Sequence, residues 1–288
     1  TAALGSFSGS WSATYDDTAS TYGLSGTTTG AVLPNLTNVT AAAAGDDFTC
    51  VIDNGAVVCW GDAVMTIPAL TNPTAITAGS AHACAIDSTG VVCWGSNSAG
   101  QTTVPSLTNP TLVSAGGSHT CALDASGVKC WGASSSGQST VPALTDPTFV
   151  SAGNSHTCAI DASGVVCWGL NASGQTTVPA TLTGATRVSA GYMHTCAIGT
   201  GGAVWCWGSN TFNRATPPVG LPPATEIAAG GIHTCAVASS VLRCWGFSLS
   251  GTPTGGGPVD SLATGYDHGC IRYNGGTAFR CWGTQPWP

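Results

Sequence analysis

The stretch TLVSAGGSHTCALDASGVKCWG, residues 111–132, decides the fold. Three short segments rich in β-favouring residues, 111–115, 119–123 and 128–131, are separated by turn residues, and an Asp-Ala-Ser-Gly turn joins the last two. This arrangement predicts antiparallel strands with a tight hairpin. Residues 138–142 predict a fourth, outer strand, because their terminal proline suits a sheet edge. The stretch therefore predicts a four-stranded antiparallel sheet.

The same pattern occurs seven times along the 288 residues, with 34–39 residues between the first cysteines of successive copies. Each copy ends its hairpin with Cys-Trp-Gly. Six copies carry Gly-x-x-His-x-Cys, and the first copy has Phe48 in place of the histidine. Tandem repeats of four short strands are typical of propeller blades. We therefore expect an all-β fold, a seven-bladed β-propeller of four-stranded antiparallel blades.

Each copy also contains one pair of cysteines. The hairpin turn places Cys121 opposite Cys130, and opposed residues in an antiparallel ladder are about 4.5–5.5 Å apart, within reach of a disulfide. Zinc is the alternative, but zinc knuckles use closely spaced C-x-x-C pairs rather than cysteines on opposed strands. We expect one disulfide within each blade, and hence an oxidising compartment. The pairs are Cys50–Cys59, Cys84–Cys93, Cys121–Cys130, Cys158–Cys167, Cys196–Cys206, Cys235–Cys244 and Cys270–Cys281.

The motifs Gly-x-x-His-Thr-x-Ala-Leu, Gly-x-Val-x-x-Trp-Gly and Asn-x-x-Gly-Gln resemble the regulator-of-chromosome-condensation repeat. They are carried by Gly116, His119, Thr120, Ala122, Leu123, Gly127, Val128, Trp131 and Gly132, and by Asn97, Gly100 and Gln101 of the preceding copy. The resemblance covers residues from about 30 to 284 and implies a seven-bladed propeller. The cysteines depart from the family pattern and argue against a nuclear or cytosolic role. Secreted propeller-type β-lactamase inhibitors are the nearer functional analogy.

The ends of the chain suggest how the ring closes. The last copy stops at residues 282–283 without an outer strand, whereas residues 27–34 align with the outer strands of other copies. We expect this N-terminal strand to complete the last blade, with the repeats at 35–288 and the propeller at 26–288. Residues 1–25 form an arm with Phe7, Trp11, Tyr15 and Tyr22, which packs on its own propeller or docks on a neighbouring subunit. The chain begins at Thr1 with no basic-then-apolar leader, so we expect a mature, secreted product.

Composition excludes several classes of partner. Six basic residues against thirteen acidic ones leave a net charge of −7, and the basic residues are scattered. Nucleic acid is therefore not an expected partner. No apolar run approaches the length of a membrane-spanning helix, so membrane insertion is not expected either.

No cofactor, metal or catalytic site is expected. The histidines recur once per blade, where a structural role bonding the backbone explains them, and inter-blade packing explains the repeated tryptophans. Asp53, Asp87, Asp124 and Asp161 begin hairpin turns, where Asx-type hydrogen bonding accounts for them better than calcium. The sequence contains a single glutamate and no nucleophile elbow. We expect a protein that is not an enzyme.

The remaining hypotheses concern binding. The leading one is an extracellular binding or scaffold propeller that engages a protein partner through its loops, and the alternatives are a self-assembling structural subunit and a carbohydrate-binding lectin. Aromatic and arginine side chains that depart from the repeat are candidate contacts: Tyr192, Trp205, Phe212, Arg214, Phe247, Tyr266 and Tyr273. N-x-Ser/Thr sequences make Asn35, Asn38 and Asn171 candidate glycosylation sites.

Overall fold

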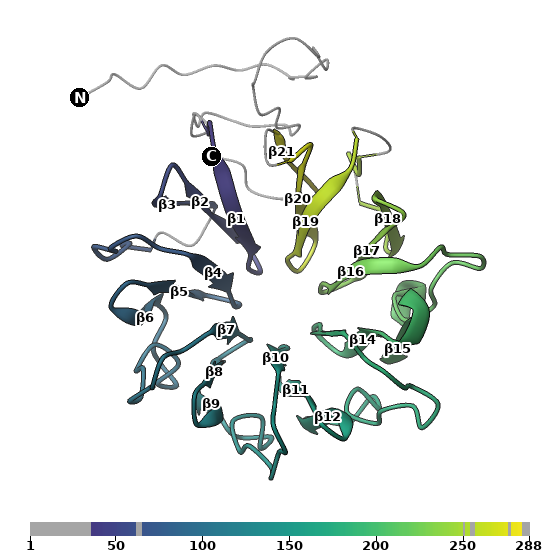
Figure 1. The fold of residues 1–288 in the computed structure, drawn as a ribbon, viewed down its shortest axis with the longest axis horizontal. Coiled ribbons are helices and arrows are strands. Elements are labelled where there is room, and N and C mark those ends of the chain that lie inside the picture. Colours follow the sequence, from purple (N-terminus) through teal and green to yellow (C-terminus); the bar gives the residue numbers. More distant parts are fainter. Residues whose placement is uncertain (1–35, 62–64, 250, 254–256, 276–277, 284–288) are drawn as a thin grey trace.

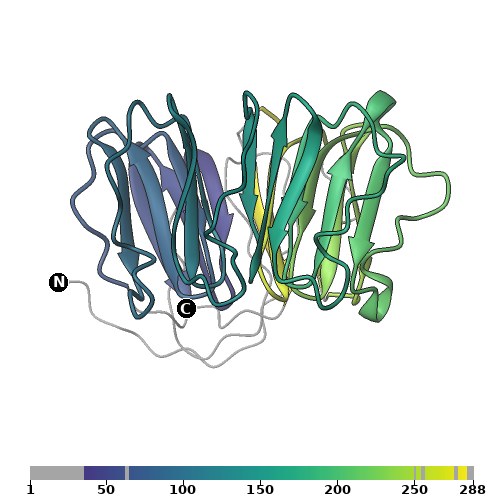
Figure 2. The same cartoon turned by 90° about the horizontal axis from the view of Figure 1, so that it is seen from below.

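A ring of seven three-stranded antiparallel sheets surrounds a central channel (Figure 1). The computed structural model describes residues 36–61, 65–249, 251–253, 257–275 and 278–283. The N-terminal arm, the expected closing strand 27–34 and Asn35 lie outside the described residues. The strands run roughly along the channel axis, so that each sheet stands edge-on to the channel (Figure 2).

Each blade is made of three consecutive strands, of which the first lies nearest the channel (Figure 1). The inner strands are β1 (Val39–Ala44), β4 (Ala75–Ala78), β7 (Leu112–Ala115), β10 (Phe149–Ala152), β13 (Arg187–Ala190), β16 (Ala224–Ala229) and β19 (Val259–Thr264). The middle strands are β2 (Phe48–Asp53), β5 (His82–Asp87), β8 (His119–Asp124), β11 (His156–Asp161), β14 (His194–Ile198), β17 (His233–Ala238) and β20 (His268–Tyr273). The outer strands are β3 (Ala56–Gly61), β6 (Gly90–Gly95), β9 (Gly127–Gly132), β12 (Gly164–Gly169), β15 (Val204–Gly208), β18 (Val241–Gly246) and β21 (Ala278–Gly283). Two short 3-10 helices, η1 (Thr200–Gly202) and η2 (Thr211–Asn213), lie in connections of blade 5.

The hairpin register agrees with the sequence prediction. In blade 3, His119 lies opposite Gly132, Cys121 opposite Cys130 and Leu123 opposite Val128. Because side chains alternate along a strand, the histidine and the disulfide occupy one face of the blade, and Thr120 occupies the other. This asymmetry repeats around the ring and determines which groups meet between blades.

One disulfide joins the middle and outer strands of every blade, as predicted. The paired Cα atoms are 4.0–4.1 Å apart. Each bridge closes a loop of about ten residues, for which the chain-entropy model gives roughly 2–3 kcal/mol of stabilisation. Each bridge lies within a single hairpin, so no disulfide covalently joins one blade to the next.

The fourth strand expected in each blade is not formed in the described residues. Residues 138–142 follow a turn in which Thr140 N–H donates to the Gly137 carbonyl, and Pro142 has no N–H to offer. The Gln138 carbonyl accepts instead from two groups of the next blade, the Thr157 hydroxyl and the Trp168 indole. The prediction of an outer strand was therefore wrong, because this segment bonds to its own turn and to the neighbouring blade rather than to β9.

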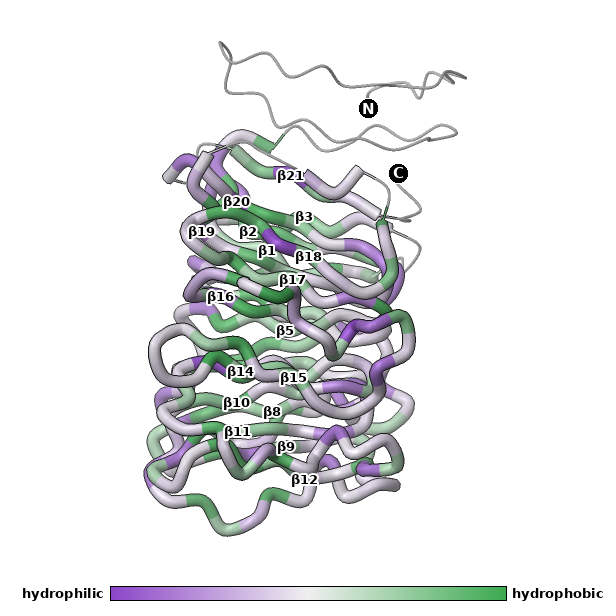
Figure 3. The backbone as a smooth tube through the Cα atoms, turned by 90° about the vertical axis from the view of Figure 1, so that its right-hand side faces the viewer, coloured by the Kyte–Doolittle hydropathy of each residue, from purple (hydrophilic) through white to green (hydrophobic). Residues whose placement is uncertain are grey.

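The apolar core consists of layers between neighbouring blades. Between blades 1 and 2, Phe48 and Cys50 pack against Ala83, Ala85 and Trp94. Comparable clusters fill the other junctions, including the one between blades 7 and 1, which closes the ring. Hydrophobic segments follow the strands, and most hydrophilic ones lie in the connections (Figure 3). No helix in the described part of the chain is long and apolar enough to cross a membrane.

We expect the intact mass of the protein, measured without reduction, to fall fourteen hydrogens below the value calculated for free thiols, because all fourteen cysteines are bridged. Non-reducing peptide mapping should recover each bridge within one hairpin. A peptide linking two blades would contradict the register.

Candidate functional site

The Gly-x-x-His turns of six blades and the Gly45–Phe48 turn of blade 1 meet at one end of the channel, which we call the channel mouth. At six junctions, the residue that directly follows the first glycine of the turn donates its backbone N–H to the carbonyl of the equivalent first glycine in the next blade, at 3.0–3.3 Å. For example, Gly117 N–H donates to the Gly153 carbonyl, and Tyr266 N–H donates to the Gly45 carbonyl across the ring closure. These bonds join the turns of neighbouring blades into a backbone ring at the mouth, where the residue after the glycine carries a side chain in five blades and is a glycine in blades 3 and 6.

Beneath the mouth, the buried histidines of five blades each bond to a threonine of the next blade. His119 Nε2 lies 2.8 Å from Thr157 Oγ1, which in turn lies 2.9 Å from the Gln138 carbonyl oxygen. The hydroxyl donates its one hydrogen to the carbonyl, so it must accept from the histidine. The imidazole therefore carries a hydrogen on Nε2. Equivalent contacts join His82 to Thr120, His156 to Thr195, His194 to Thr234 and His268 to Thr49.

This pairing explains the one blade that lacks a histidine. Phe48 of blade 1 faces Ala83 of blade 2, which has no hydroxyl to accept a hydrogen bond. An apolar ring opposite an apolar side chain replaces the polar pair. The sequence predicted that the histidines bond to backbone. Five of them instead bond through Nε2 to a threonine of the next blade, a partner that sequence analysis missed. That threonine directly follows the histidine of its own blade or, in blade 1, Phe48, and its recurrence in the repeat was the available signal.

Burial depresses the basicity of all six histidines, which are at most 1% exposed. Desolvation of the charged form lowers the pKa to about 4 for His82, His156 and His233 and to about 3 for His119, His194 and His268. Neutral imidazoles at physiological pH fit a structural role as hydrogen-bond donors.

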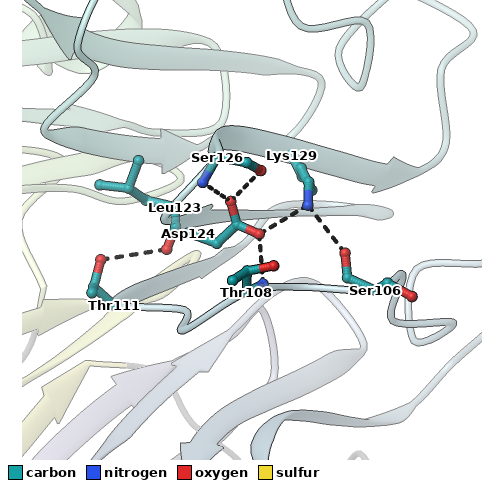
Figure 4. A network of polar contacts seen from close by, with 7 residues as sticks. All are labelled: Ser106, Thr108, Thr111, Leu123, Asp124, Ser126 and Lys129. Carbon is teal, nitrogen blue, oxygen red and sulfur yellow. Dashed lines mark hydrogen bonds and ion pairs between the residues drawn. The ribbon is translucent and has the colours of Figure 1, made fainter.

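The hairpin aspartates also serve the framework. Asp124 accepts from the Thr108 and Ser126 N–H groups, the Ser126 hydroxyl and Lys129 Nζ, the last at 2.9 Å (Figure 4). These hydrogen bonds, led by the Ser126 hydroxyl, lower the pKa of the Asp124 carboxyl group well below its usual range. Asp87 and Asp161 are held in the same way. Among the described residues, no group of three or more His, Cys, Asp or Glu side chains could hold a metal ion.

The residues at the mouth differ between blades. A cavity of about 110 Å³ opens there. Its lining includes, in blade order, the residues that follow the conserved glycine: Asp46, Ser80, Gly117, Asn154, Tyr192, Gly231 and Tyr266. Burial raises the pKa of the Asp46 carboxyl group, a hydrogen bond with Ser80 opposes that shift, and the neighbouring charges of Asp47 and Asp267 add to it.

Two of the predicted contact residues meet at this mouth. The rings of Tyr192 and Tyr266 lie edge to face, with centroids 5.3 Å apart and planes at 84°. Gly231 of the intervening blade makes this possible, because a Cβ there would lie 2.4 Å from the Tyr266 ring. Tyr266 is 38% exposed, so the pair is accessible from solvent.

A second aromatic pair lies farther from the axis on the same face. Phe212 and Phe247 are 5.2 Å apart, edge to face, and are 51% and 47% exposed. Phe212 has φ of 64°, a left-handed conformation that is unfavourable for a bulky side chain. Such strain is typical of functional positions. The Phe247 N–H donates to the Ile232 carbonyl, which places this pair beside the blade 6 turn.

Arg214 connects the two pairs and is itself buried. It occupies the position of Gln101, and its carbonyl accepts from Thr234 and Trp245 as the glutamine carbonyls do in other blades. Its guanidinium donates to the Ser209 carbonyl at 3.1 Å and to the Gly231 carbonyl at 2.5 Å. Arg214 therefore supports the loop of Phe212 and the mouth at Gly231 from beneath, and is not a surface contact.

The other candidate residues lie elsewhere. Trp205 is half-buried and packs in the layer between blades 4 and 5, and Tyr273 is half-buried between blades 6 and 7. Asn38 and Asn171 are exposed, and Asn171 Oδ1 accepts from the Thr176 N–H at 2.9 Å. Glycosylation of either asparagine stays a prediction. A wider cavity of about 570 Å³ within the channel is lined by Arg187, Phe149 and Glu226 among others, a grouping that sequence reasoning missed.

The fold defines a class of protein: a seven-bladed β-propeller stapled by one disulfide per blade. The family model of the Regulator of chromosome condensation (RCC1) repeat matches residues 74–101, 111–138, 148–175 and 185–214. These segments correspond to blades 2–5. Each match ends at the residue whose carbonyl accepts hydrogen bonds from the threonine hydroxyl and the tryptophan indole of the next blade. Four of the seven blades therefore match the RCC1 repeat.

Solved structures share this fold. The ectodomain of receptor kinase CR4 from Physcomitrella patens is 24% identical, with 86% of this chain and 74% of that chain covered and a TM-score of 0.72. The CRINKLY WD40 ectodomain of receptor kinase ACR4 from Arabidopsis thaliana is 26% identical, with coverages of 88% and 98% and a TM-score of 0.70. Yeast RCC1 (Prp20), in its structure with Kap60, is 16% identical, with coverages of 79% and 78% and a TM-score of 0.65. Comparison with curated protein sequences found no match.

We expect acid to destabilise the protein between pH 6.5 and 4. A histidine in the unfolded chain has a pKa near 6.5, so it binds a proton in this pH range, whereas the buried histidine of the folded protein stays neutral. The free energy of unfolding therefore falls, as the pH is lowered, by up to about 1.4 kcal/mol per pH unit for each histidine. Guanidinium denaturation at pH 7.5 and pH 5 measures the loss. Equal stability at both values would contradict burial of neutral rings.

We expect Thr157→Ala to destabilise the protein by about 1–3 kcal/mol, because His119 loses the acceptor of its Nε2 hydrogen. The double variant His119→Phe/Thr157→Ala copies the Phe48–Ala83 pair of blades 1 and 2 and should recover part of that loss. Guanidinium denaturation at pH 7.5 measures both variants. A double variant no more stable than Thr157→Ala would show that the two side chains are not coupled.

Proposed function

We propose that this protein is a secreted, non-catalytic binding propeller that engages a protein partner through the face bearing the channel mouth. The observation that carries the proposal is the gathering of exposed aromatic residues on this face. Of the five large hydrophobic side chains exposed in the described residues, Tyr266, Phe212 and Phe247 belong to the two aromatic pairs. Aromatic anchors on a rigid support are typical of interface hot spots.

The support under this face favours recognition rather than catalysis. The backbone ring at the mouth and Arg214 hold the aromatic pairs in place, so little conformational entropy is lost on binding. The exposed rings lie on blades 5–7 rather than at equivalent positions in many blades, a distribution that favours one asymmetric partner over a repeated sugar ligand. A protein of similar fold, yeast RCC1 (Prp20), forms a complex with another protein, Kap60.

An extracellular location is supported by the cysteine chemistry. Seven disulfides persist in an oxidising compartment and are rare in the cytosol. Receptor-kinase ectodomains are among the similar structures. A secreted or cell-surface setting also suits a stapled framework with few charged groups.

We expect Phe212→Ser/Phe247→Ser to reduce capture of the partner about tenfold or more, since hot-spot truncations commonly cost at least 2 kcal/mol. The immobilised variant and the wild type are incubated with the secreted and cell-surface fraction of the producing organism, and captured proteins are quantified by mass spectrometry. Val241→Ser is the matched control, because Val241 is 40% exposed and begins β18 at the opposite end of the blade.

The proposal requires a protein that wild type and Val241→Ser retain and the double variant loses. Circular dichroism and thermal denaturation establish that all three proteins are folded. Equal retention of every captured protein by all three would place binding elsewhere and overturn the proposal.

A further inference from the structure

The cavity at the channel mouth is too small for a drug-sized ligand. Its volume of about 110 Å³ falls below the roughly 300–1,000 Å³ of ordinary small-molecule sites. It is nevertheless walled by polar and aromatic side chains from different blades. A space of this size suits a single side chain that projects from a larger partner.

The aromatic wall of the cavity fits a planar cation. In an edge-to-face pair, the ring that presents its edge keeps both of its own faces free of its partner, and Tyr192 and Tyr266 adopt this arrangement over Gly231. Cations bind to the faces of aromatic rings, and a guanidinium group also stacks on them as a planar group. The pair therefore provides a surface on which an arginine side chain can lie.

The part of the wall next to Tyr266 is acidic. Asp46 lines the same cavity, and its turn is joined to that of Tyr266 by the hydrogen bond from Tyr266 N–H to the Gly45 carbonyl. Asp47 and Asp267 act electrostatically on Asp46, so three carboxyl groups gather at this sector. The nearby cation is Arg214, which is 5% exposed and donates to the Ser209 and Gly231 carbonyls. Three carboxyl groups thus lie near the mouth against one cation, Arg214.

We propose that the channel mouth binds an arginine side chain of the protein partner, with its guanidinium stacked on the Tyr192–Tyr266 pair and paired with the Asp46 carboxylate. This inference rests on the proposed function and names the chemistry of the partner at the centre of the face. The outer pair, Phe212 and Phe247, then receives apolar residues that flank the arginine.

The probe for this site is N-acetyl-L-arginine amide, titrated into the full chain labelled with ¹³C-tyrosine, with N-acetyl-L-citrulline amide as the uncharged counterpart. The chain contains five tyrosines. We expect arginine amide to shift the ring signals of Tyr192 and Tyr266, assigned with single Tyr→Phe variants, and to leave the other three unchanged. Citrulline amide should bind at least about fivefold more weakly than arginine amide, because it lacks the charge that interacts with the rings and the carboxylate.

Variants separate the two walls of the site. Asp46→Asn should weaken binding of arginine amide about fivefold and leave the weak binding of citrulline amide unchanged. Gly231→Ala should weaken it as well, because the added Cβ displaces the Tyr266 ring. Val241→Ser should bind as the wild type does. Non-reducing peptide mapping and thermal denaturation confirm that each variant is folded, and Tyr266→Ala replaces any that is not.

Equal affinity for the arginine and citrulline probes, or no shift of the two tyrosine signals, would overturn the arginine site. Unchanged binding in folded Asp46→Asn and Tyr266→Ala would overturn it too. None of these results bears on capture of the partner through Phe212 and Phe247. Conversely, retention of every captured protein by the Phe212→Ser/Phe247→Ser variant would overturn the proposed function even if arginine amide bound at the mouth.

Discussion

The buried threonine hydroxyl between blades is the interaction on which this structure depends. It accepts from the histidine of the preceding blade and donates to a carbonyl of that blade's outer loop, as Thr157 does with His119 and Gln138. Both partners are removed from water, where an unpaired polar group is costly. The hydrogen bonds therefore determine the spacing and rotation between neighbouring sheets, and the apolar layers fill the space that remains.

The hairpin disulfides contribute in a different way. Each one staples two strands of the same blade, so it limits the unfolded chain without joining one blade to the next. Cohesion around the ring comes from the inter-blade layers, the threonine contacts and the backbone bonds at the mouth. With 7% charged residues, the protein relies little on surface ion pairs, and its neutral histidines avoid the cost of burying charge.

The blades that follow the repeat and the blades that depart from it lie in different parts of the ring. Blades 2–5 match the RCC1 repeat, and the histidine of each of them bonds to a threonine of the next blade. Phe48 with Ala83 and His233 opposite Gly269 mark junctions without a hydroxyl partner. The aromatic pairs lie on blades 5–7, at the edge of the regular region. The side chains on the mouth face can therefore differ from blade to blade, because the backbone hydrogen bonds that join the blades at the mouth do not involve those side chains.

By itself, the sequence determined the blade number, the hairpin register and the disulfide pairing, because a period-2 strand with opposed cysteines permits one register. It also identified Tyr192, Tyr266, Phe212 and Phe247 as departures from the repeat. Only the tertiary structure decided that they form two pairs on one face, that Arg214 lies beneath them and that Trp205 packs inside. Those outcomes depend on contacts between blades some 35–40 residues apart in the chain, such as Tyr266 lying across Gly231. The missing fourth strand has the same cause: the Gln138 carbonyl bonds to the next blade, a competition that no local pattern reveals.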